Sequence, residues 1–523
     1  MERTSARPDR TKELSTESPL RLLFKYSWPA LVAMTLNALY AVVDRFYIGH
    51  GCGEAAIAGM TLTFPVMMVF GAFGVFIGAG HSAVLSIKLG EGDSEACEKL
   101  LGQLVAFKLA FFFILTPVVL FNIDTILRWC GGGGVSDEAF DCARRYLKIV
   151  LASHLFSHMA FGLSAMMRAE GSAKTSMMAM IVGFGANAIL DPFFIFGPTY
   201  RFDVNLGFAS FPMPGMDLGV EGAAWATVFS MAASCAYALS YYLRGRSAVR
   251  LSFGKIRFHR GLVAKPCGIG FAPFLQQLLG AVINMALPAA FAKWAVDKAS
   301  ATTQIASLGV FEGALILIIM PVLGAQQGIQ PVIGYNWGAR NFRRVKSALL
   351  AGLWITSALC VAACLMQTVS PLAEAVARIF VPSDNPALLA VAKHDLMLSN
   401  CMLWCIGLNI VMTTYFQSIG HPVSAIVLST MRQGFVILPV ILFLPYFMED
   451  KTFAIWLSMP ISDVACCLMT MVPFALHLRF LSKVKDRQKS YARASHGNAK
   501  SSFELGALSL ESWNANEEGI IEL

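Results

Sequence analysis

The residues of this sequence that could do chemistry are acids and amides inside apolar stretches. Asp44 ends an apolar run that begins after Lys25. A carboxylate in a membrane helix costs about 2.5–3.5 kcal/mol, so it persists where it is paired, hydrated or used. Asp44 is therefore a candidate site for a cation or a proton. The alternative is an acid at the membrane interface that the neighbouring Arg45 neutralises.

Asn187 and Asp191 form a second polar group. They lie four residues apart and so project from one face of a helix, and Pro192 has no N–H to bond the carbonyl of Ala188. A carboxylate, an amide and a free carbonyl suit a hard cation such as Na⁺, or a protonated aspartate held by hydrogen bonds. The simpler alternative is a proline kink whose polar groups are satisfied locally.

Other intramembrane polar residues give weaker signals. Thr227 could add a hydroxyl ligand, although membrane threonines usually bond their own i−4 carbonyl. Glu312 stands in mid-membrane and is either a substrate or proton site or a hydrated vestibule acid. His154 and His158 lie four residues apart, but no His-Glu-x-x-His motif accompanies them, so cavity lining or helix packing is favoured over metal binding.

The composition defines the class of chain that must position these residues. It has 523 residues, of which 56% are hydrophobic and 14% charged, too apolar for a soluble globule. The sequence predicts an all-α membrane protein whose apolar runs can each span about 30 Å of hydrocarbon. Twelve such runs fall at 26–48, 60–87, 103–123, 146–167, 175–197, 219–243, 266–292, 303–328, 347–369, 393–417, 423–447 and 453–480.

Charge and cysteine content indicate topology and exclude other classes. The net charge of +8 comes from Lys and Arg between apolar runs, so it reports membrane orientation and not nucleic-acid binding. Basic connectors at 244–265 and 340–346 predict that both termini are cytoplasmic and that the protein is multi-pass in the plasma membrane. The twelve cysteines are scattered without metal-ligand spacing, so we interpret them as packing residues.

The chain also repeats weakly. The segment 89–95 resembles 337–343 in character, 167–173 resembles 416–422, and Pro29 corresponds to Pro273. This predicts two pseudo-symmetric lobes of six helices each, related by an axis along the membrane normal, with a ligand site between them. The predicted organisation is an N-terminal tail at 1–20, an N-lobe at 21–245, a linker at 246–261, a C-lobe at 262–482 and a C-terminal tail at 483–523. The connector 198–217 is expected to form a small hairpin or an ordered cap.

Taken together, several motifs resemble the multidrug and toxic compound extrusion (MATE) family, and most closely its bacterial multidrug efflux branch. The motifs are Pro29 with Asp44 fifteen residues later, Arg-Ala-Glu-Gly171, Asn187-x-x-x-Asp191-Pro192, Gly-Val-Glu-Gly-Ala-Ala224 and Gln327-Gly-Ile-Gln-Pro331-x-x-x-Tyr-Asn336-x-Gly338. The resemblance covers roughly residues 20–482 and implies a V-shaped exporter that works by alternating access.

The resemblance also implies roles for individual residues. Asp44, Asn187, Asp191 and Thr227, with the carbonyl of Ala223, correspond to a cation site, which is a metal site only if Na⁺ is the coupling ion. Pro29 matches the proline about which the first helix bends. Asn37 and Tyr40 would line the same pocket. Glu312 and Gln276 are further candidates for the substrate cavity.

The function implied is exchange of organic, cationic or amphipathic small molecules for inward H⁺ or Na⁺ by a monomer that needs no cofactor. The sequence contains no nucleotide-binding motif, so an ion gradient must drive the transport. One alternative is a flippase for lipid-linked saccharides, for which Arg168 and Arg432 are the available cavity cations. A second alternative is a membrane-embedded transferase with His154 or His158 as base. Arg432 and Asp463 are further intramembrane charges whose partners the sequence does not assign.

Overall fold

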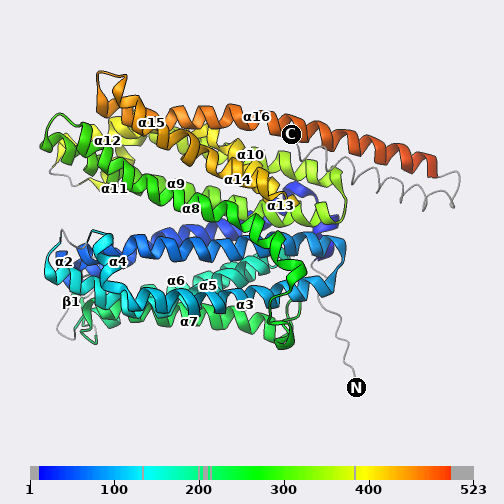
Figure 1. Cartoon of the computed structure of the whole chain (residues 1–523), viewed down its shortest axis with the longest axis horizontal. Helices are drawn as coiled ribbons and strands as arrows, with labels where there is room; N and C mark the ends of the chain where they lie inside the picture. The colour runs from blue at the N-terminus through cyan, green and yellow to red at the C-terminus, as the bar shows by residue number, and fades with distance from the viewer. Residues whose placement is uncertain are drawn as a thin grey trace.

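The chain folds into long helices that run side by side (Figure 1). The computed structural model describes residues 11–131, 135–197, 201–203, 210–212, 215–381 and 385–495. The first half contains α1 (Thr11–Thr16), α2 (Pro19–Glu91), α3 (Ser94–Phe121), α4 (Ile123–Trp129), α5 (Asp137–Ala169), α6 (Ala173–Ile195), β1 (Arg201–Asp203), β2 (Ser210–Pro212) and α7 (Gly219–Leu243).

The second half follows a linker that contains the 3₁₀ turn η2 (Phe253–Lys255). It comprises α8 (Arg260–Trp294), α9 (Lys298–Gly338), α10 (Phe342–Thr368), α11 (Ser370–Phe380), α12 (Pro386–Ser399), η3 (Leu403–Cys405), α13 (Ile406–Ile419), α14 (Pro422–Thr430), the π-helix η4 (Met431–Ile437), α15 (Leu438–Phe443), η5 (Leu444–Tyr446) and α16 (Lys451–Ser495).

Eleven segments of the described chain are long and apolar enough to cross a membrane. The part of α2 before Gly53 contains the whole of the first predicted span, 26–48. The first two predicted spans are not separated by a polar connector, because α2 continues through both and departs from helical geometry only at Gly53 (φ 78°, ψ −172°). Glycine adopts this positive φ without a Cβ clash, so the chain changes direction there.

The structure tests two predictions about segments at the edges of the helices, the connector 198–217 and the C-terminal tail. The predicted hairpin in the connector 198–217 is confirmed by the antiparallel pairing of β1 with β2, in which Arg201 faces Pro212. By contrast, α16 continues to Ser495, beyond the expected start of the C-terminal tail at 483. Residues 496–523 lie outside the described part of the chain.

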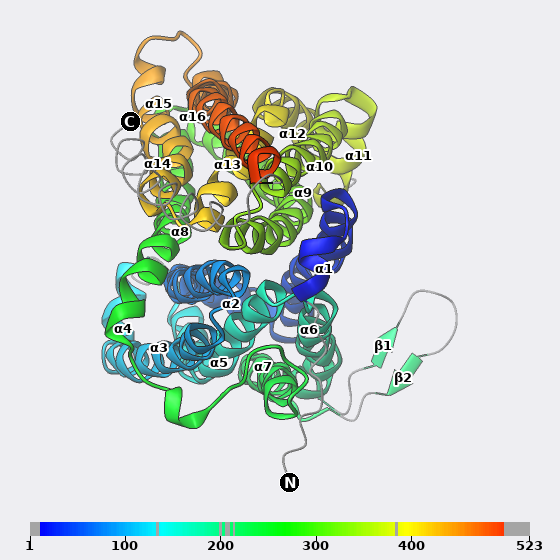
Figure 2. The ribbon, with the colours of Figure 1, turned by 90° about the vertical axis from the view of Figure 1, so that its right-hand side faces the viewer.

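The helices form two bundles, with α2–α7 in one and α8–α16 in the other (Figure 2). The turn after α2 in the first bundle and the turn after α9 in the second have the same backbone conformation. Gly92 (φ 77°) and Arg340 (φ 55°) both adopt a left-handed conformation. Each is followed by a helix cap, because Asp93 accepts a hydrogen bond from the Ala96 N–H at 3.0 Å and Asn341 accepts one from the Arg344 N–H at 3.3 Å. The predicted internal repeat is therefore present in the backbone.

The two bundles meet most closely at the end that carries α1 and the α7–α8 linker, which we call the linker end. Glycines bring the helices together there. A Cβ on Gly328 of α9 would lie 2.5 Å from the Ser27 nitrogen of α2, and a Cβ on Gly324 would lie 2.5 Å from the Leu31 Cα. At Gly80 of α2, a Cβ would lie 2.8 Å from the Pro266 carbonyl carbon of α8. Such small residues allow membrane helices to pack backbone to backbone.

Part of the predicted N-terminal tail is folded against this end. Leu14 of α1 is fully buried in a core cluster with Leu22 and Tyr26 of α2 and Val345 of α10. Its carbonyl accepts hydrogen bonds from the Asn336 Nδ2 at 3.2 Å and the Arg344 Nη2 at 3.1 Å. The start of the chain is thus attached to the second bundle.

The linker itself is attached to the first bundle. The Glu170 Oε2, just after α5, accepts hydrogen bonds from the Ser247 Oγ at 2.6 Å, the Ala248 N–H at 3.1 Å and the Val249 N–H at 3.3 Å. The Lys255 Nζ donates to the Glu98 Oε2 of α3 at 2.7 Å. Burial raises the pKa of Glu170 to about 7, although its hydrogen-bond donors favour the charged form.

Candidate functional site

The polar residues predicted to form a cation site meet inside the first bundle. α6 contributes Asn187 and Asp191, which are both fully buried, α7 contributes Thr227, and α2 contributes Asp44, which is 6% exposed. The Asn187 Nδ2 donates to the Asp191 Oδ1 at 3.2 Å and, at the limit of hydrogen-bond distance, to the Thr227 Oγ1 at 3.5 Å. We call these four residues the acid cluster.

Small residues allow α6 and α7 to approach closely enough for these contacts. A Cβ on Gly183 of α6 would lie 3.0 Å from the Ser234 Cβ of α7, and a Cβ on Gly222 of α7 would lie 2.6 Å from the Phe194 carbonyl carbon. The Ser234 Oγ donates to the Ala179 carbonyl at 2.7 Å and ties the same pair together. Gly183 of α6 and Gly222 of α7 therefore allow Thr227 to lie against Asn187.

Two buried oxygen atoms of the acid cluster have no donor. Among the described residues, none donates a hydrogen bond to the Asn187 Oδ1 or the Asp191 Oδ2. The carboxylates of Asp191 and Asp44 also repel each other electrostatically. Buried acceptors without a donor are costly, and a bound cation or a proton on one carboxylate would relieve both the missing donor and the repulsion. The atoms available to coordinate a cation here are all oxygens, which fits Na⁺ or H⁺.

Two tyrosines surround the cluster. Tyr40 of α2, which the sequence places near Asp44, interacts with Asp44, Asp191 and Thr227 and stacks on Phe184 with ring centroids 5.3 Å apart. Tyr146 of α5 interacts electrostatically with the same two acids and is 4% exposed. Sequence reasoning missed Tyr146, because only tertiary packing brings α5 beside α2 and α6.

The other residues predicted for this region show only local bonds or burial. Thr227 donates to its own i−4 carbonyl, that of Ala223, at 3.0 Å, which is the local bond usual for a membrane threonine. Asn37 is partly buried on α2, and Pro29 lies buried within the same helix. The side chain of Arg45 lies outside the described part of the structure.

The two predicted cavity residues of the second bundle do not join the acid cluster. Glu312 is partly buried on α9, and Gln276 is exposed on α8. It is the next residue, Gln277, that contacts α2, with its Nε2 3.6 Å from the Met68 Sδ. The roles of Glu312 and Gln276 in a substrate cavity stay predictions.

The second bundle has a charge pair of its own. The Arg432 Nε donates to the Asp463 Oδ1 at 2.7 Å, and Asp463 is 1% exposed. Arg432 belongs to the π-helix η4, a geometry that is rare and often marks functional positions. This supplies the partners that the sequence left unassigned.

A closely packed cavity with no free volume for a water molecule lies beside the acid cluster. Met180, Phe184, Met231 and Phe161 line it, and Phe184 also stacks on Tyr40. Drug-sized ligands occupy pockets of about 300–1,000 Å³, so a substrate would have to widen this cavity. Flexible methionines are suited to such repacking.

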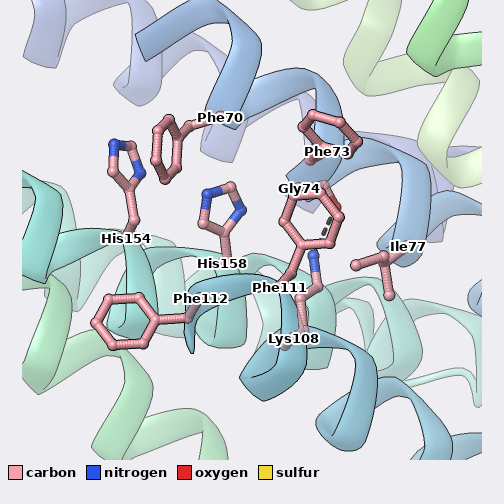
Figure 3. Close-up of a pocket in the computed structure, with 9 residues that line it drawn as sticks. All are labelled: Phe70, Phe73, Gly74, Ile77, Lys108, Phe111, Phe112, His154 and His158. Atoms are coloured by element: carbon pink, nitrogen blue, oxygen red, sulfur yellow. Dashed lines mark hydrogen bonds between the residues drawn. The ribbon is translucent and has the colours of Figure 1, made fainter. Parts of the chain in front are cut away.

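A second cavity lies between α2, α3 and α5. Its lining includes Lys108, His154 and His158 together with four phenylalanines (Figure 3). The expectation that the two histidines line a cavity is confirmed.

Two lobes of spanning helices, with a cluster of buried acids and amides inside one of them, define a membrane transporter. Comparison with known proteins identifies the family. The MatE family profile matches residues 29–193 and 274–442, one segment in each lobe. The chain therefore belongs to the MATE family of multidrug efflux transporters.

Individual relatives cover nearly the whole chain. It is 25% identical over 463 residues to the multidrug export protein MepA of Staphylococcus aureus (strain NCTC 8325 / PS 47), a match that covers 87% of this chain and 94% of MepA. It is 26% identical over 459 residues to MepA of Staphylococcus haemolyticus (strain JCSC1435), covering 87% and 93%.

Solved structures have the same fold. An outward-facing multidrug resistance MATE family transporter of the MOP superfamily superposes with a TM-score of 0.79 at 22% identity, covering 90% of this chain and 98% of that one. The MATE multidrug transporter DinF-BH, solved as a complex, gives a TM-score of 0.76 at 26% identity, covering 91% and 98%. The predicted family and fold class are confirmed, and the alternative of a membrane-embedded transferase is wrong, because the family consists of transporters.

Proposed function

We propose that this protein is a secondary antiporter that exports organic, cationic or amphipathic compounds in exchange for inward H⁺ or Na⁺. One observation carries the proposal. Two buried oxygen atoms, the Asn187 Oδ1 and the Asp191 Oδ2, accept no hydrogen bond from any described residue, and they lie beside the carboxylate of Asp44. An exporter needs a site that holds a positive charge in one state and releases it in the other. The names of the MepA relatives support multidrug export as the direction and purpose of transport.

The available driving force is sufficient for useful extrusion. One charge that moves inward through 100 mV provides about 2.3 kcal/mol. At about 1.4 kcal/mol per tenfold change in concentration, one coupling ion sustains a gradient of about 50-fold for an uncharged substrate. One-for-one exchange for a monovalent cation moves no net charge, so that export draws on the concentration gradient of the coupling ion. A single acid cluster can therefore drive transport without a second cation site.

We propose that the working cycle is alternating access of the central cavity to the two sides of the membrane. The close glycine packing at the linker end supports an assignment of the present state as closed at that end. The similarity to a transporter solved in an outward-facing conformation supports the same assignment. In this proposal, cation binding between Asp44 and Asp191 bends the first span near Pro29 and displaces the substrate from the neighbouring cavity of Met180 and Phe184.

The proposed cellular setting follows from the charge distribution. Basic residues gather in the connectors at the linker end, which would face the cytoplasm in a plasma membrane. Both termini would then be cytoplasmic. We propose a monomer, with 21–245 and 262–482 as its two lobes and 246–261 as the linker, and with no cofactor other than the coupling ion.

The test is transport of a fluorescent organic cation in everted membrane vesicles, with Na⁺ and pH gradients imposed independently. Asp191→Asn and Asp44→Asn should abolish gradient-driven transport, because neither amide can carry the coupling charge. Asp395→Asn is the matched control, since Asp395 is a buried acid of the second lobe whose Oδ2 accepts from the Ser307 Oγ at 2.6 Å. Normal pumping by both acid-cluster variants would refute the proposal.

The flippase alternative has less support. It needs free cations in the central cavity to hold a pyrophosphate, and the two arginines available to it are engaged. The Arg168 Nη1 donates to the Ser176 Oγ at 2.8 Å, and Arg432 is paired with Asp463.

A further inference from the structure

The cavity between α2, α3 and α5 collects three side chains that can carry positive charge. Lys108 comes from α3 and His154 and His158 from α5, and Phe70, Phe73, Phe111 and Phe112 complete most of the wall (Figure 3). We call these three residues the basic cluster. It lies in the same lobe as the acid cluster but on a different set of helices, since α6 and α7 do not contribute to it.

Lys108 is buried without an acid. It is 2% exposed, and its Nζ donates to the Gly74 carbonyl at 2.6 Å. That carbonyl takes one of three N–H groups of an ammonium. Among the described residues, no carboxylate forms an ion pair or a hydrogen bond with Lys108, His154 or His158. An ammonium ion held in hydrocarbon by one neutral acceptor costs several kcal/mol, so Lys108 is either deprotonated or accompanied by a counter-charge.

Both glycines beside the cluster create room for its side chains. A Cβ on Gly74 of α2 would lie 2.5 Å from the His158 Cε1, and a Cβ on Gly162 of α5 would lie 3.0 Å from the Lys108 Cε. Within the described part of the chain, the one hydrogen-bond partner of the His154 Nε2 is the weakly accepting Met67 Sδ, at 3.3 Å. The helices thus accommodate these basic side chains and give them few acceptors.

Size limits what could enter. The cavity volume open to a water-sized molecule is about 10 Å³, about what a single water molecule needs, and its phenylalanine walls exclude divalent, strongly hydrated ions. We propose that the basic cluster binds a monatomic monovalent anion, a halide, which the Lys108 ammonium and the His158 ring N–H would hold between α2, α3 and α5.

An anion there would lie near the proposed coupling site without belonging to it. Tyr146, which interacts with Asp44 and Asp191, precedes His154 by eight residues on α5, a rise of about 12 Å along a helix. The inference rests on the cavity and on Lys108, and it stands whether or not the acid cluster couples to H⁺ or Na⁺.

The experiment uses the purified full-length protein and needs no transport assay. Thermal unfolding is followed in sodium salts of bromide, chloride, formate and gluconate at one ionic strength. Gluconate is too large for the cavity and serves as the reference anion. We expect a saturable rise in the unfolding midpoint with bromide and chloride, and a smaller rise or none with formate, which is larger than the cavity.

Lys108→Met should lose this rise. Lys99→Met is the matched control on the same helix, because the Lys99 Nζ is paired with Glu95 at 2.6 Å at the surface, and it should keep the rise. Crystals of the wild-type protein grown in sodium bromide provide a second measurement, in which an anomalous peak is expected beside the Lys108 Nζ. An equal response to all four anions, a response that Lys108→Met retains, or crystals without that peak would overturn the inference.

Discussion

The contact between Gly328 of α9 and Ser27 of α2 gives a quantitative prediction about the closed linker end. In Gly328→Ala, the new methyl group would lie 2.5 Å from the Ser27 nitrogen and 2.6 Å from its Cα. Both are backbone atoms, so no side-chain rotation can relieve the clash. The two helices must separate by about 1 Å to reach ordinary van der Waals distance.

The cost can be worked out from two contributions. Overpacking by one methyl group costs about 1–3 kcal/mol. Separation of the helices also weakens the buried hydrogen bond from the Ser27 Oγ to the Ala325 carbonyl, at 3.2 Å, which contributes about 1 kcal/mol. The closed linker end should therefore lose about 2–4 kcal/mol, which raises the population of its open form by about 30-fold to several hundred-fold.

Hydrogen–deuterium exchange of the purified protein measures this directly. We expect Gly328→Ala to accelerate exchange of the amides around Ser27 and Leu31 in α2, while the amides of α5 and α6 keep wild-type rates. Gly309→Ala is the matched control in the same helix, because no atom lies within 4 Å of its Cβ position. The reasoning is refuted if Gly328→Ala exchanges like the wild type, or if Gly309→Ala opens the linker end equally.

Two further predictions concern charged groups away from the acid cluster. Because burial raises the pKa of Glu170 from 4.5 to about 7, its ionisation opposes folding, so stability should fall by up to about 3 kcal/mol as the pH rises from about 4.5 to above 7. Thermal unfolding of Glu170→Gln should lack this part of the pH dependence; a pH profile identical to that of the wild type would contradict the assignment. Asp463→Leu should destabilise the second lobe by about 3–5 kcal/mol, because it leaves Arg432 buried without its partner. The double variant with Arg432→Met should recover most of that loss in denaturation experiments, and equal stabilities of the single and double variants would contradict the pairing.

Local sequence patterns predicted the parts of the site that lie on single helices. The spacing of Asn187 and Asp191 on one helical turn was enough to predict their contact, and the repeated turn residues predicted the two lobes. Contacts between helices that are distant in sequence could not be predicted from local patterns. Tyr146 lies in an ordinary amphipathic pattern, and nothing local indicates that α5 faces the two acids.

The basic cluster shows a signal that the sequence did contain. Lys108 stands inside the predicted third span, where a charge is as costly as that of Asp44. The spacing of the two histidines predicts cavity lining or helix packing in preference to metal binding, and the sequence does not connect them with Lys108. Their relation to Lys108 depends on the packing of α3 against α5, which Gly162 permits and which no helical periodicity encodes.

Gly90 packs against the turn after α9, and Gly338 packs against α2, so the two contacts are reciprocal. A Cβ on Gly90 would lie 2.8 Å from the Ala339 nitrogen, and a Cβ on Gly338 would lie 2.9 Å from the Ile87 carbonyl carbon. The two glycines hold corresponding positions in the two halves, so each contacts the surroundings of the other. That reciprocity is the geometry of a two-fold homodimer. Each half therefore presents the same glycine to the other, so a larger residue at either position would push apart the same two helices, although the halves differ elsewhere, one carrying the acid cluster and the other the Arg432–Asp463 pair.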